Sequence, residues 1–392
     1  MRVNIYKLVY LALGLTIMSL LFLGCGVKEN SSNTNEILLG GDYELTGGLA
    51  AVGQQTVNGI NLAIKQANEN GGVLGKQIKF IVADNKSEPS ESANAITKLI
   101  NTDKVKLVFG AVASSNVLAA VQIAEDAKVP LITATATNPT VTVDNGKVRK
   151  YIFRTCFIDP FQGDIMANFA INTLQAKTAA IYVDSSSDYS KGLATIFEQN
   201  FTKHGGKVLL KEAFLQKDQD FKATLTKIKA MNPDVIFIPA YYEEVGKILK
   251  QASDMGLKAK IMGTDGWDDP KLIEIAGISA VEGTYFSNHY SPQDTDPHVV
   301  KFVESYRAEY NQEPSALAVL GYDAALVVID AIKRAGSDDP EKIRQALEET
   351  KDMQITTGLL SIDPNHNSIK SVVVVELKEG KQVFKEKIVP TK

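Results

Sequence analysis

The chain of 392 residues contains few of the side chains that most often carry chemistry. It has two cysteines, one tryptophan and four histidines, which are His204, His289, His298 and His366. The histidines are scattered, so no local metal-binding motif is present, and we predict neither a metal nor another cofactor. Gly-x-Ser-x-Gly, His-Glu-x-x-His and Cys-x-x-Cys are also absent, and we therefore do not expect an enzyme.

The chain also lacks an excess of positive charge. Its 42 Lys and Arg are outnumbered by 46 Asp and Glu, which gives a formal net charge of −4. Residues 1–24 contain Arg2 and Lys7 and no acid, so the remainder is more acidic still. Without a basic stripe, a nucleic acid is not expected as a partner. Hydrophobic residues make up 44% of the chain, as in ordinary globular proteins, and the length predicts two lobes of usual domain size.

The N-terminus carries a targeting segment. Arg2 and Lys7 precede the apolar run Leu8–Leu23, which ends at Gly24-Cys25. Because this run is short for a membrane span, a single transmembrane anchor is the less favoured alternative. The sequence Leu21-Phe22-Leu23-Gly24-Cys25 resembles the lipobox of a bacterial lipoprotein, although Phe22 stands where such signals usually have Leu.

This resemblance implies that residues 1–24 are a signal peptide and that Cys25 receives lipid. Residues 25–36 are polar and rich in Ser and Asn, as expected of a flexible tether. We therefore predict that the chain is exported and lipid-anchored to the outer face of the cytoplasmic membrane, on the periplasmic side where the cell has an outer membrane. Lipidation of Cys25 leaves Cys156 without a disulfide partner, and its apolar neighbours predict a buried residue rather than a nucleophile.

Residues 107–139 contain the strand–helix–strand unit around which we expect the chain to be arranged. Leu107–Phe109 and Val129–Thr133 are short apolar runs typical of buried parallel strands, and Val117–Ala127 repeats apolar residues at helical spacing. Hydroxyl-bearing loops follow both strands, with Ser114 in the first and Thr137 in the second. Ligands of open α/β sheets bind at such strand ends, and helix-start amides favour an anion such as an amino-acid carboxylate. In the simpler alternative, Ser114 only caps a helix and Thr137 only belongs to a turn.

Strands and helices alternate along most of the chain. Between residues 37 and 133, and again between 161 and 262, short apolar strands are separated by amphipathic helices. This alternation predicts an α/β fold with two doubly wound lobes, each with a parallel sheet covered by helices on both faces. The segments Ser371–Leu377 and Gln382–Val389 flank a Glu-Gly-Lys turn and predict a hairpin.

Short motifs that occur in order along nearly the whole mature chain carry a family resemblance. They are Leu45-Thr46-Gly47, Asn68, Gly71-Gly72, Asp84, Gly110, Ser114-Ser115, Thr137-Asn138-Pro139, Arg154-Thr155, Gln162-Gly163, Asp188-Tyr189-Ser190, Gly263-Thr264-Asp265-Gly266 and Glu282-Gly283. Each motif alone is weak, but the ordered set resembles the branched-chain amino-acid-binding (leucine/isoleucine/valine-binding) proteins of ABC transporters. The resemblance implies a type I periplasmic-binding-protein fold, in which two lobes joined by three crossovers close on a ligand. It places lobe I at residues 37–155 and 284–365, and lobe II at 156–283 and 366–392.

The resemblance also implies a ligand site in the first lobe. Ser114 and Thr137 would offer hydroxyls to the carboxylate of an amino acid, and Thr137 would serve both charged ends. The remaining first-lobe contacts are predicted to be Val112 and Ala113, which line the pocket, Thr135, which supplies backbone groups, and Ala136.

In the second lobe the ammonium group needs an acceptor. Asp265 follows a predicted strand and matches the family's acidic residue in type, although an Asp that only forms the turn before Gly266 is the alternative. Tyr189 matches an aromatic that reaches the ligand, and so does either Tyr241 or Tyr242; the sequence leaves open which of the two faces the cleft.

The class of ligand side chain is less well defined. Val52 stands where the resemblance leads us to expect an aromatic residue. We predict that Trp267 covers the ligand side chain instead, since Trp offers a large apolar face. A branched-chain aliphatic ligand and an aromatic one both stay open, and the aliphatic one is favoured.

These observations predict a monomeric, membrane-tethered solute-binding lipoprotein that captures an amino acid and delivers it to an ABC permease. A sensor with the same fold, which reports the ligand to a receptor, is one alternative. An exported hydrolase that uses a noncontiguous Ser/His/Asp set is a less favoured one. A sugar-responsive repressor has a related two-lobed body, but no DNA-binding helix pair precedes Ile37.

Overall fold

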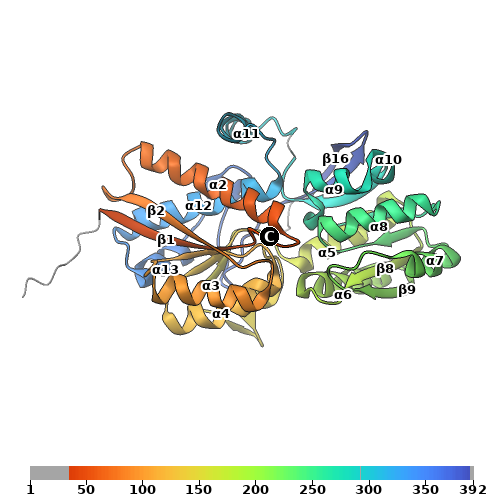
Figure 1. Cartoon of the computed structure of the whole chain (residues 1–392), viewed down its shortest axis with the longest axis horizontal. Coiled ribbons are helices and arrows are strands. Elements are labelled where there is room, and N and C mark those ends of the chain that lie inside the picture. The colour runs from red at the N-terminus through yellow and green to blue at the C-terminus, as the bar shows by residue number, and fades with distance from the viewer. Residues whose placement is uncertain (1–34, 292, 389–392) are drawn as a thin grey trace, which may run out of the picture. The chain divides into compact units, whose positions relative to one another are not determined.

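The computed structural model describes residues 35–291 and 293–388, and residues 36–392 form one compact unit. The predicted signal peptide (1–24), Cys25 and all but the end of the predicted tether (25–36) lie outside the described residues. Two sheets organise this unit, one parallel and one mostly parallel, and helices separate most of their successive strands (Figure 1). The predicted α/β class is therefore confirmed.

The first sheet has five strands, all parallel, in the order β2-β1-β3-β4-β7. Their bounds are β1 (Glu36–Tyr43), β2 (Gln77–Asp84), β3 (Val108–Gly110), β4 (Leu131–Thr133) and β7 (Ile152–Arg154). The helices packed around this sheet are α2 (Ala50–Glu69), α3 (Pro89–Asn101), α4 (Ser114–Ala127), α11 (Pro297–Tyr310), α12 (Ala316–Ala335) and α13 (Pro340–Glu348). We call this sheet and these helices the first lobe.

Both faces of the first sheet are covered. Phe109 and Ile132 belong to the apolar cluster that contains α2 and α12, whereas their neighbours Val108 and Leu131 belong to the cluster of α3 and α4. This division follows from the alternation of side chains along a strand. Helices α2 and α12 pack closely at Gly59. A Cβ added at this position would lie only 1.9 Å from the carbonyl oxygen of Ala318.

The second sheet has seven strands in the order β16-β15-β12-β11-β10-β8-β9. Their bounds are β8 (Thr178–Asp184), β9 (Lys207–Phe214), β10 (Val235–Phe237), β11 (Lys260–Gly263), β12 (Thr284–Asn288), β15 (Val372–Lys378) and β16 (Lys381–Ile388). The first five in chain order are parallel, and β15 and β16 form the predicted hairpin antiparallel to β12. The helices packed around this sheet are α5 (Asp159–Asn168), α6 (Asp188–Lys203), α7 (Lys222–Met231), α8 (Tyr242–Asp254), α9 (Pro270–Ala276) and α10 (Ile278–Val281). We call this sheet and these helices the second lobe.

Shorter elements complete the unit. They are the hairpins β5 (Val143–Asp144)–β6 (Lys147–Val148) and β13 (Met353–Ile355)–β14 (Gly358–Leu360), the 3₁₀ turns η1 (Pro139–Val141) and η3 (Asp265–Trp267), and the π-helical segment η2 (Phe169–Thr173). Within the part of the chain that the structure describes, no helix has the length and apolar character of a bilayer span.

The chain passes between the two sheets three times. It leaves the first sheet after β7, leaves the second after β12, and enters the second again at β15. Since β12 (Thr284–Asn288) pairs with β11 and β15, a lobe defined by its sheet keeps residues 284–288 in the second lobe. By sheet membership, the boundary between the second lobe and the following first-lobe segment lies after Asn288. The boundary predicted at 283/284 concerns the units that move when the lobes close, and it remains a prediction.

Candidate functional site

The residues predicted to bind a ligand all follow carboxyl ends of parallel strands. In the first lobe they follow β3 and β4, and in the second they follow β8, β10 and β11. In each sheet these ends include the point where strand order reverses, which is β1/β3 in one and β8/β10 in the other. All of these residues are at most 8% exposed; they are Val112, Ala113, Ser114, Thr135, Ala136, Thr137, Tyr189, Tyr241, Tyr242, Asp265 and Trp267.

Glu44 directly follows β1, and its carboxylate forms hydrogen bonds with backbone amides just before α4. Its carboxylate accepts hydrogen bonds from the backbone N–H of Val112 (2.9 Å) and Ala113 (3.0 Å) and from Nδ2 of Asn116 (2.9 Å). Burial raises the pKa of Glu44, and these donors oppose the rise. Two amides predicted to be near the ligand are therefore used within the chain. A ligand carboxylate at this helix start would meet the hydroxyls and the next N–H groups, such as that of Ser114.

A second buried carboxyl group, Asp42, lies near Glu44. Asn85 donates its Nδ2 to Asp42 Oδ1 at 3.0 Å, and Ser92 Oγ hydrogen-bonds both Asp42 Oδ2 and, at 3.0 Å, the carbonyl of Asn116. Burial raises the pKa of Asp42 to about 8, so this group carries a proton at neutral pH. The network ties β1, the loop after β2 and helix α3 to the first turn of α4.

The loop after β4 is held in place by the buried guanidinium of Arg154. Its Nη1 donates to the carbonyl of Ala136 at 2.9 Å and its Nη2 to that of Asn138 at 2.7 Å. Ser114 Oγ accepts the backbone N–H of Asn138 at 3.3 Å, which joins this loop to α4. Thr137, between the two held carbonyls, has a buried hydroxyl without a hydrogen bond of regular geometry among the described residues. The carboxyl group of Asp159 is near enough for this hydroxyl to affect its pKa.

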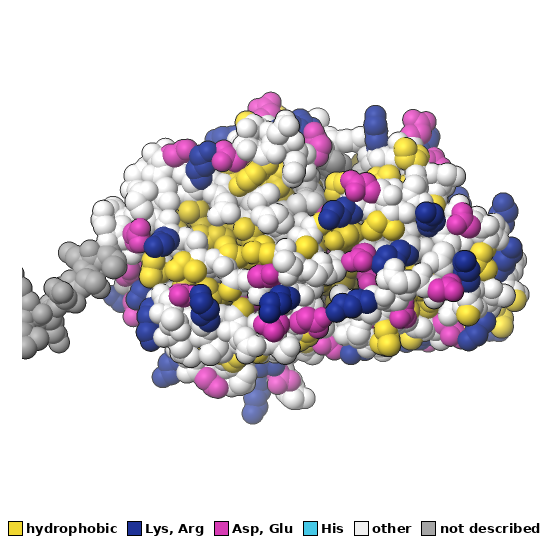
Figure 2. Space-filling view, in the orientation of Figure 1, with side chains coloured by type: hydrophobic (Ala, Val, Ile, Leu, Met, Phe, Trp, Pro, Cys, Tyr) yellow, Lys and Arg dark blue, Asp and Glu magenta, His cyan; other side chains and the backbone are white. Residues whose placement is uncertain are grey.

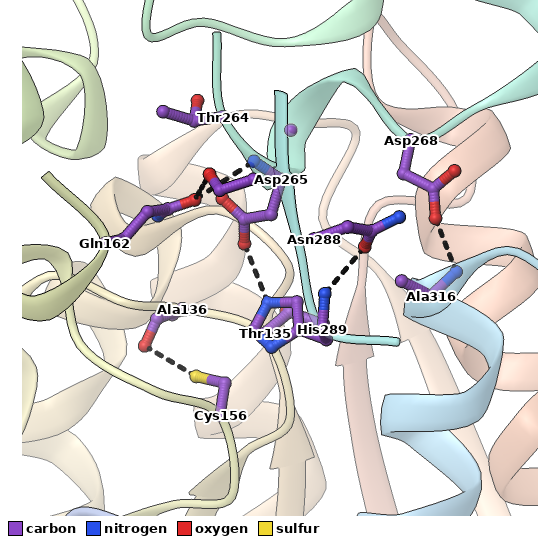
Figure 3. Close-up of polar contacts among 12 residues, drawn as sticks. Thr135, Ala136, Cys156, Gln162, Thr264, Asp265, Asp268, Asn288, His289 and Ala316 are labelled. Atoms are coloured by element: carbon purple, nitrogen blue, oxygen red, sulfur yellow. Dashed lines mark hydrogen bonds and ion pairs between the residues drawn. The ribbon is translucent and has the colours of Figure 1, made fainter. Parts of the chain in front are cut away.

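Asp265 is the centre of the second-lobe half of the site (Figure 3). Its Oδ1 accepts the hydroxyl of Tyr189 at 2.6 Å, and its Oδ2 lies 2.9 Å from Nε2 of His289. Its backbone N–H donates to Gln162 Oε1 at 3.1 Å. Gln162 Nε2 is buried and has no partner among the described residues. Sequence inspection singled out Asp265 and Tyr189 but not His289 or Gln162 as site residues.

The two adjacent tyrosines have different surroundings. Tyr241 stacks on Tyr189, with ring centroids 5.0 Å apart, and lines a small crevice of about 40 Å³ together with Leu49, Ala113 and other residues of both lobes. Tyr242 begins α8; burial and the charge of Asp269 raise its pKa. Tyr241 is therefore the tyrosine beside the predicted site.

Two further predicted residues have their polar groups engaged within the chain. Thr135 Oγ1 donates to the carbonyl of Val112 at 3.2 Å, and Trp267 Nε1 donates to the carbonyl of Ile238 at 3.0 Å. The indole of Trp267 lies on Gly263, where an added Cβ would be 2.0 Å from the ring. Trp267 thus packs against the end of β11.

Asp159, the first residue of α5, lies between the two halves of the site. Its N–H donates to the carbonyl of Thr137 at 3.0 Å. Burial and, more weakly, the charge of Asp265 raise the pKa of Asp159 to about 8, against the effect of the nearby Thr137 hydroxyl. The site thus contains a buried first-lobe hydroxyl, that of Thr137, and a buried second-lobe carboxylate, that of Asp265. Such a pair can bind the carboxylate and the ammonium group of one zwitterion.

A reactive cysteine or a metal-binding cluster would indicate catalysis. Cys156 is fully buried, and burial raises the pKa of its thiol to about 12, which disfavours the thiolate. Among residues 35–291 and 293–388, no cluster of three His, Cys, Asp or Glu side chains could hold a metal ion. On the face shown in Figure 2, Lys and Arg are interspersed with Asp and Glu.

Comparisons with known proteins agree with this geometry. Residues 36–382 match the family model described as periplasmic binding protein. A leucine-, isoleucine-, valine-, threonine- and alanine-binding protein of Pseudomonas aeruginosa is 33% identical, over 85% of this chain and 87% of the relative. The crystal structure of a leucine-binding protein from Thermotoga maritima is similar with a TM-score of 0.85 and 43% identity, over 90% of this chain and 99% of that one. A branched-chain amino-acid transporter substrate-binding protein from Streptococcus pneumoniae, solved with isoleucine, has a TM-score of 0.86 and 37% identity, over 91% and 100%. The chain therefore belongs to the periplasmic binding protein family.

Proposed function

We propose that this protein binds one free amino acid between its two lobes and delivers it to an ABC importer. The observation that carries the proposal is that the buried carboxylate of Asp265 in one lobe and the buried hydroxyls of Ser114 and Thr137 in the other all follow carboxyl ends of parallel strands. An ammonium group in so dry a site needs an anionic partner, because an unpaired buried charge is costly. The relatives named above bind amino acids, which supports the same ligand class here.

The roles of the residues follow from their positions. Ser114 and Thr137 would hold the ligand carboxylate, together with N–H groups at the start of α4. Asp265 would accept the ammonium group, and Val112, Ala113, Thr135 and Ala136 would form the first-lobe wall. Tyr189 and Tyr241 would form the second-lobe wall, with Tyr242 and Trp267 packed outside them.

We assign the ligand to the branched-chain aliphatic class. The first-lobe residues proposed to contact the ligand include the buried apolar side chains of Val112, Ala113 and Ala136, which suit an aliphatic side chain. Two of the relatives bind leucine or isoleucine, which supports this assignment. An aromatic amino acid is the alternative, and a titration that includes phenylalanine separates the two.

The test is calorimetric titration of ligand-stripped protein with leucine, isoleucine, valine and phenylalanine. Asp265→Ala should weaken binding by roughly 2–5 kcal/mol, or about 30-fold to a few thousand-fold, because the ammonium loses a buried charged partner. Asp265→Asn keeps the shape and one acceptor but loses the charge, so its affinity should lie between those of wild type and Asp265→Ala. Thermal melts without ligand control for folding. An Asp265→Ala variant that binds within about threefold of wild type would show that Asp265 is only a turn residue.

We further propose that the chain is exported as a lipoprotein, anchored through Cys25 outside the cytoplasmic membrane. The support is the lipobox-like Leu21-Phe22-Leu23-Gly24-Cys25 and the polar segment 25–36. Labelled fatty acid should enter the wild-type chain and not Cys25→Ser; a wild-type chain that takes up no label would refute the anchor.

Delivery to a permease and the absence of catalysis belong to the same proposal. Deletion of the protein should reduce cellular uptake of its amino acid, whereas unchanged uptake together with confirmed binding would favour the sensor. Turnover of an ester or amide panel by the purified protein would favour the hydrolase.

A further inference from the structure

His289 lies between the ligand site and the segments that join the lobes. It directly follows β12, its side chain is fully buried, and its backbone N–H donates to Asn288 Oδ1 at 2.8 Å (Figure 3). Its Nε2 lies 2.9 Å from Asp265 Oδ2. Its ring stacks on Phe157, with centroids 3.7 Å apart and planes 10° from parallel. The stack fixes the plane of the imidazole, so the direction of its Nε2–H toward Asp265 is fixed as well.

The Asp265 carboxylate keeps room for a ligand in this arrangement. A carboxylate oxygen has about two lone-pair sites, and Tyr189 and His289 each use one site on a different oxygen. One site on each oxygen is left for an ammonium group. Without the His289 donor, the carboxylate would be free to rotate toward Tyr189, Thr264 and the backbone of its own turn.

The charge state of His289 depends on groups from two segments. Asp265 and Asp268 act on it from the turn after β11, and Lys370 acts on it from the third passage. Burial lowers the pKa of His289, the two carboxylates oppose this shift, and Lys370 adds to it. The ring is therefore neutral at neutral pH, with Nε2–H donating to Asp265 and a buried Nδ1 that has no partner among the described residues.

We propose that His289 is a positioning residue, which holds Asp265 in the orientation that receives the ligand ammonium. This inference rests on the proposed function. A proton added at Nδ1 places a positive charge beside the ammonium, so proton and ligand binding oppose each other. Affinity should therefore fall as the pH drops below the pKa of His289, by at most about tenfold per pH unit.

Two substitutions separate the hydrogen bond from the aromatic packing. His289→Phe can keep the stack on Phe157 but has no donor, and its affinity should fall by about 10-fold to 100-fold. His289→Gln loses the stack but can place an N–H donor where Nε2 lies, so it should bind within about fivefold of wild type. Only His289→Gln should bind well and also lose the decline in affinity at acid pH.

His366 provides a matched control. It too is buried in a segment that joins the lobes, and it stacks on a phenylalanine, Phe153, with centroids 4.2 Å apart and planes 10° from parallel. Its contacts are the carbonyl of Ile152 at 3.0 Å and the carboxylate of Glu348 at 3.3 Å rather than Asp265. His366→Phe should therefore leave the affinity and its pH profile unchanged.

The experiment is calorimetric titration of the four proteins with the amino acid that wild type binds, from pH 5 to 8, with melts as a folding control. If wild type binds none of the amino acids, the proposed function fails. If wild type binds but His289→Phe binds within about threefold of wild type, or if His289→Gln loses as much affinity as His289→Phe, His289 is only a packing residue and this inference is wrong.

Discussion

Asp42 and Glu44 are two buried acids at the end of β1, and their neighbours suit different protonation states. Glu44 accepts three N–H donors, as a charged carboxylate does. Asp42 instead meets the hydroxyl of Ser92, which can accept a hydrogen bond from the protonated carboxyl group and donate its own hydrogen to the carbonyl of Asn116. One neutral and one charged acid thus support the first turn of α4, where the ligand carboxylate is proposed to bind.

A pH dependence of stability follows for Asp42. The unfolded chain loses this proton near pH 3.8, whereas the folded protein keeps it to about pH 8, so this group lowers the free energy of unfolding as pH rises between these values. Asp42→Asn mimics the protonated form, with Nδ2 donating to Ser92 Oγ and Oδ1 accepting from Asn85. The variant should match wild type near pH 4, exceed it in stability near pH 8, and show a slope smaller by at most about 1.4 kcal/mol per pH unit. Urea denaturation between pH 4 and 8 measures this.

Asp84 gives the control of opposite sign. Partial burial opposes the shift, but hydrogen bonds from Thr46, Lys86 and Leu45 lower the pKa of Asp84. Its contribution to stability is present above its unfolded pKa and is lost as pH falls through the lower folded value. Asp84→Asn should therefore be less stable than wild type at neutral pH. If the free energy of unfolding changed with pH in the same way for wild type and Asp42→Asn, the assignment of a neutral Asp42 would be contradicted.

Sequence alone predicted those site residues that stand in short motifs. Ser114, Thr137 and Asp265 could be found because each follows an apolar strand within a few residues. Glu44 and His289 also directly follow strands, but their contacts with Val112 and Asp265, which are 68 and 24 residues distant, form only in the fold and could not be read from the sequence. An acid directly after a buried strand was the one local signal for Glu44.

At the scale of elements, the N-termini of α4 and α6 meet across the two lobes. Ser115 Oγ accepts the backbone N–H of Asp188, the first residue of α6, at 3.0 Å. Asn138 Nδ2 donates to the carbonyl of the same residue at 2.9 Å. Both hydrogen bonds are made to the backbone of Asp188, the residue before Tyr189. They hold the lobes together beside the proposed ligand.

Loss of the Ser115 hydroxyl should therefore speed ligand release. Ser115→Ala removes one acceptor between the lobes and leaves the proposed ligand contacts in place, so dissociation should be about 3-fold to 10-fold faster. The control is Lys217→Ala, which breaks the exposed ion pair of Lys217 and Glu88, also between the lobes, and should change the rate less than about twofold. Stopped-flow measurement of release gives both rates; equal rates for Ser115→Ala and wild type would rule out a role of this contact in closure.

The arrangement of elements was predictable where patterns are local. Alternation of apolar strands and amphipathic helices predicted both sheets, and the Glu-Gly-Lys turn predicted the β15–β16 hairpin. The three-residue strand β7 was missed because it follows a polar stretch, and its pairing with β4 depends on the whole sheet. The partners of β12, which are β11 and β15, lie far apart in sequence, so the sheet to which β12 belongs could not be read from the local pattern.

At the scale of the whole molecule, the segments that pass between the sheets contact one another. The N–H of Arg154 donates to the carbonyl of His366 at 3.1 Å, and Ser368 Oγ donates to the carbonyl of Cys156 at 2.8 Å. The first and third passages are thus joined side by side.

Small-angle X-ray scattering, with and without a saturating amino acid, tests most directly whether the lobes close on the ligand. In the proposed mechanism, ligand bridges Thr137 and Asp265 and favours contacts such as that of Ser115 with Asp188, so the population shifts toward the closed form. The radius of gyration should therefore be smaller with ligand than without it. Identical scattering profiles, with binding confirmed by calorimetry on the same samples, would contradict capture by lobe closure.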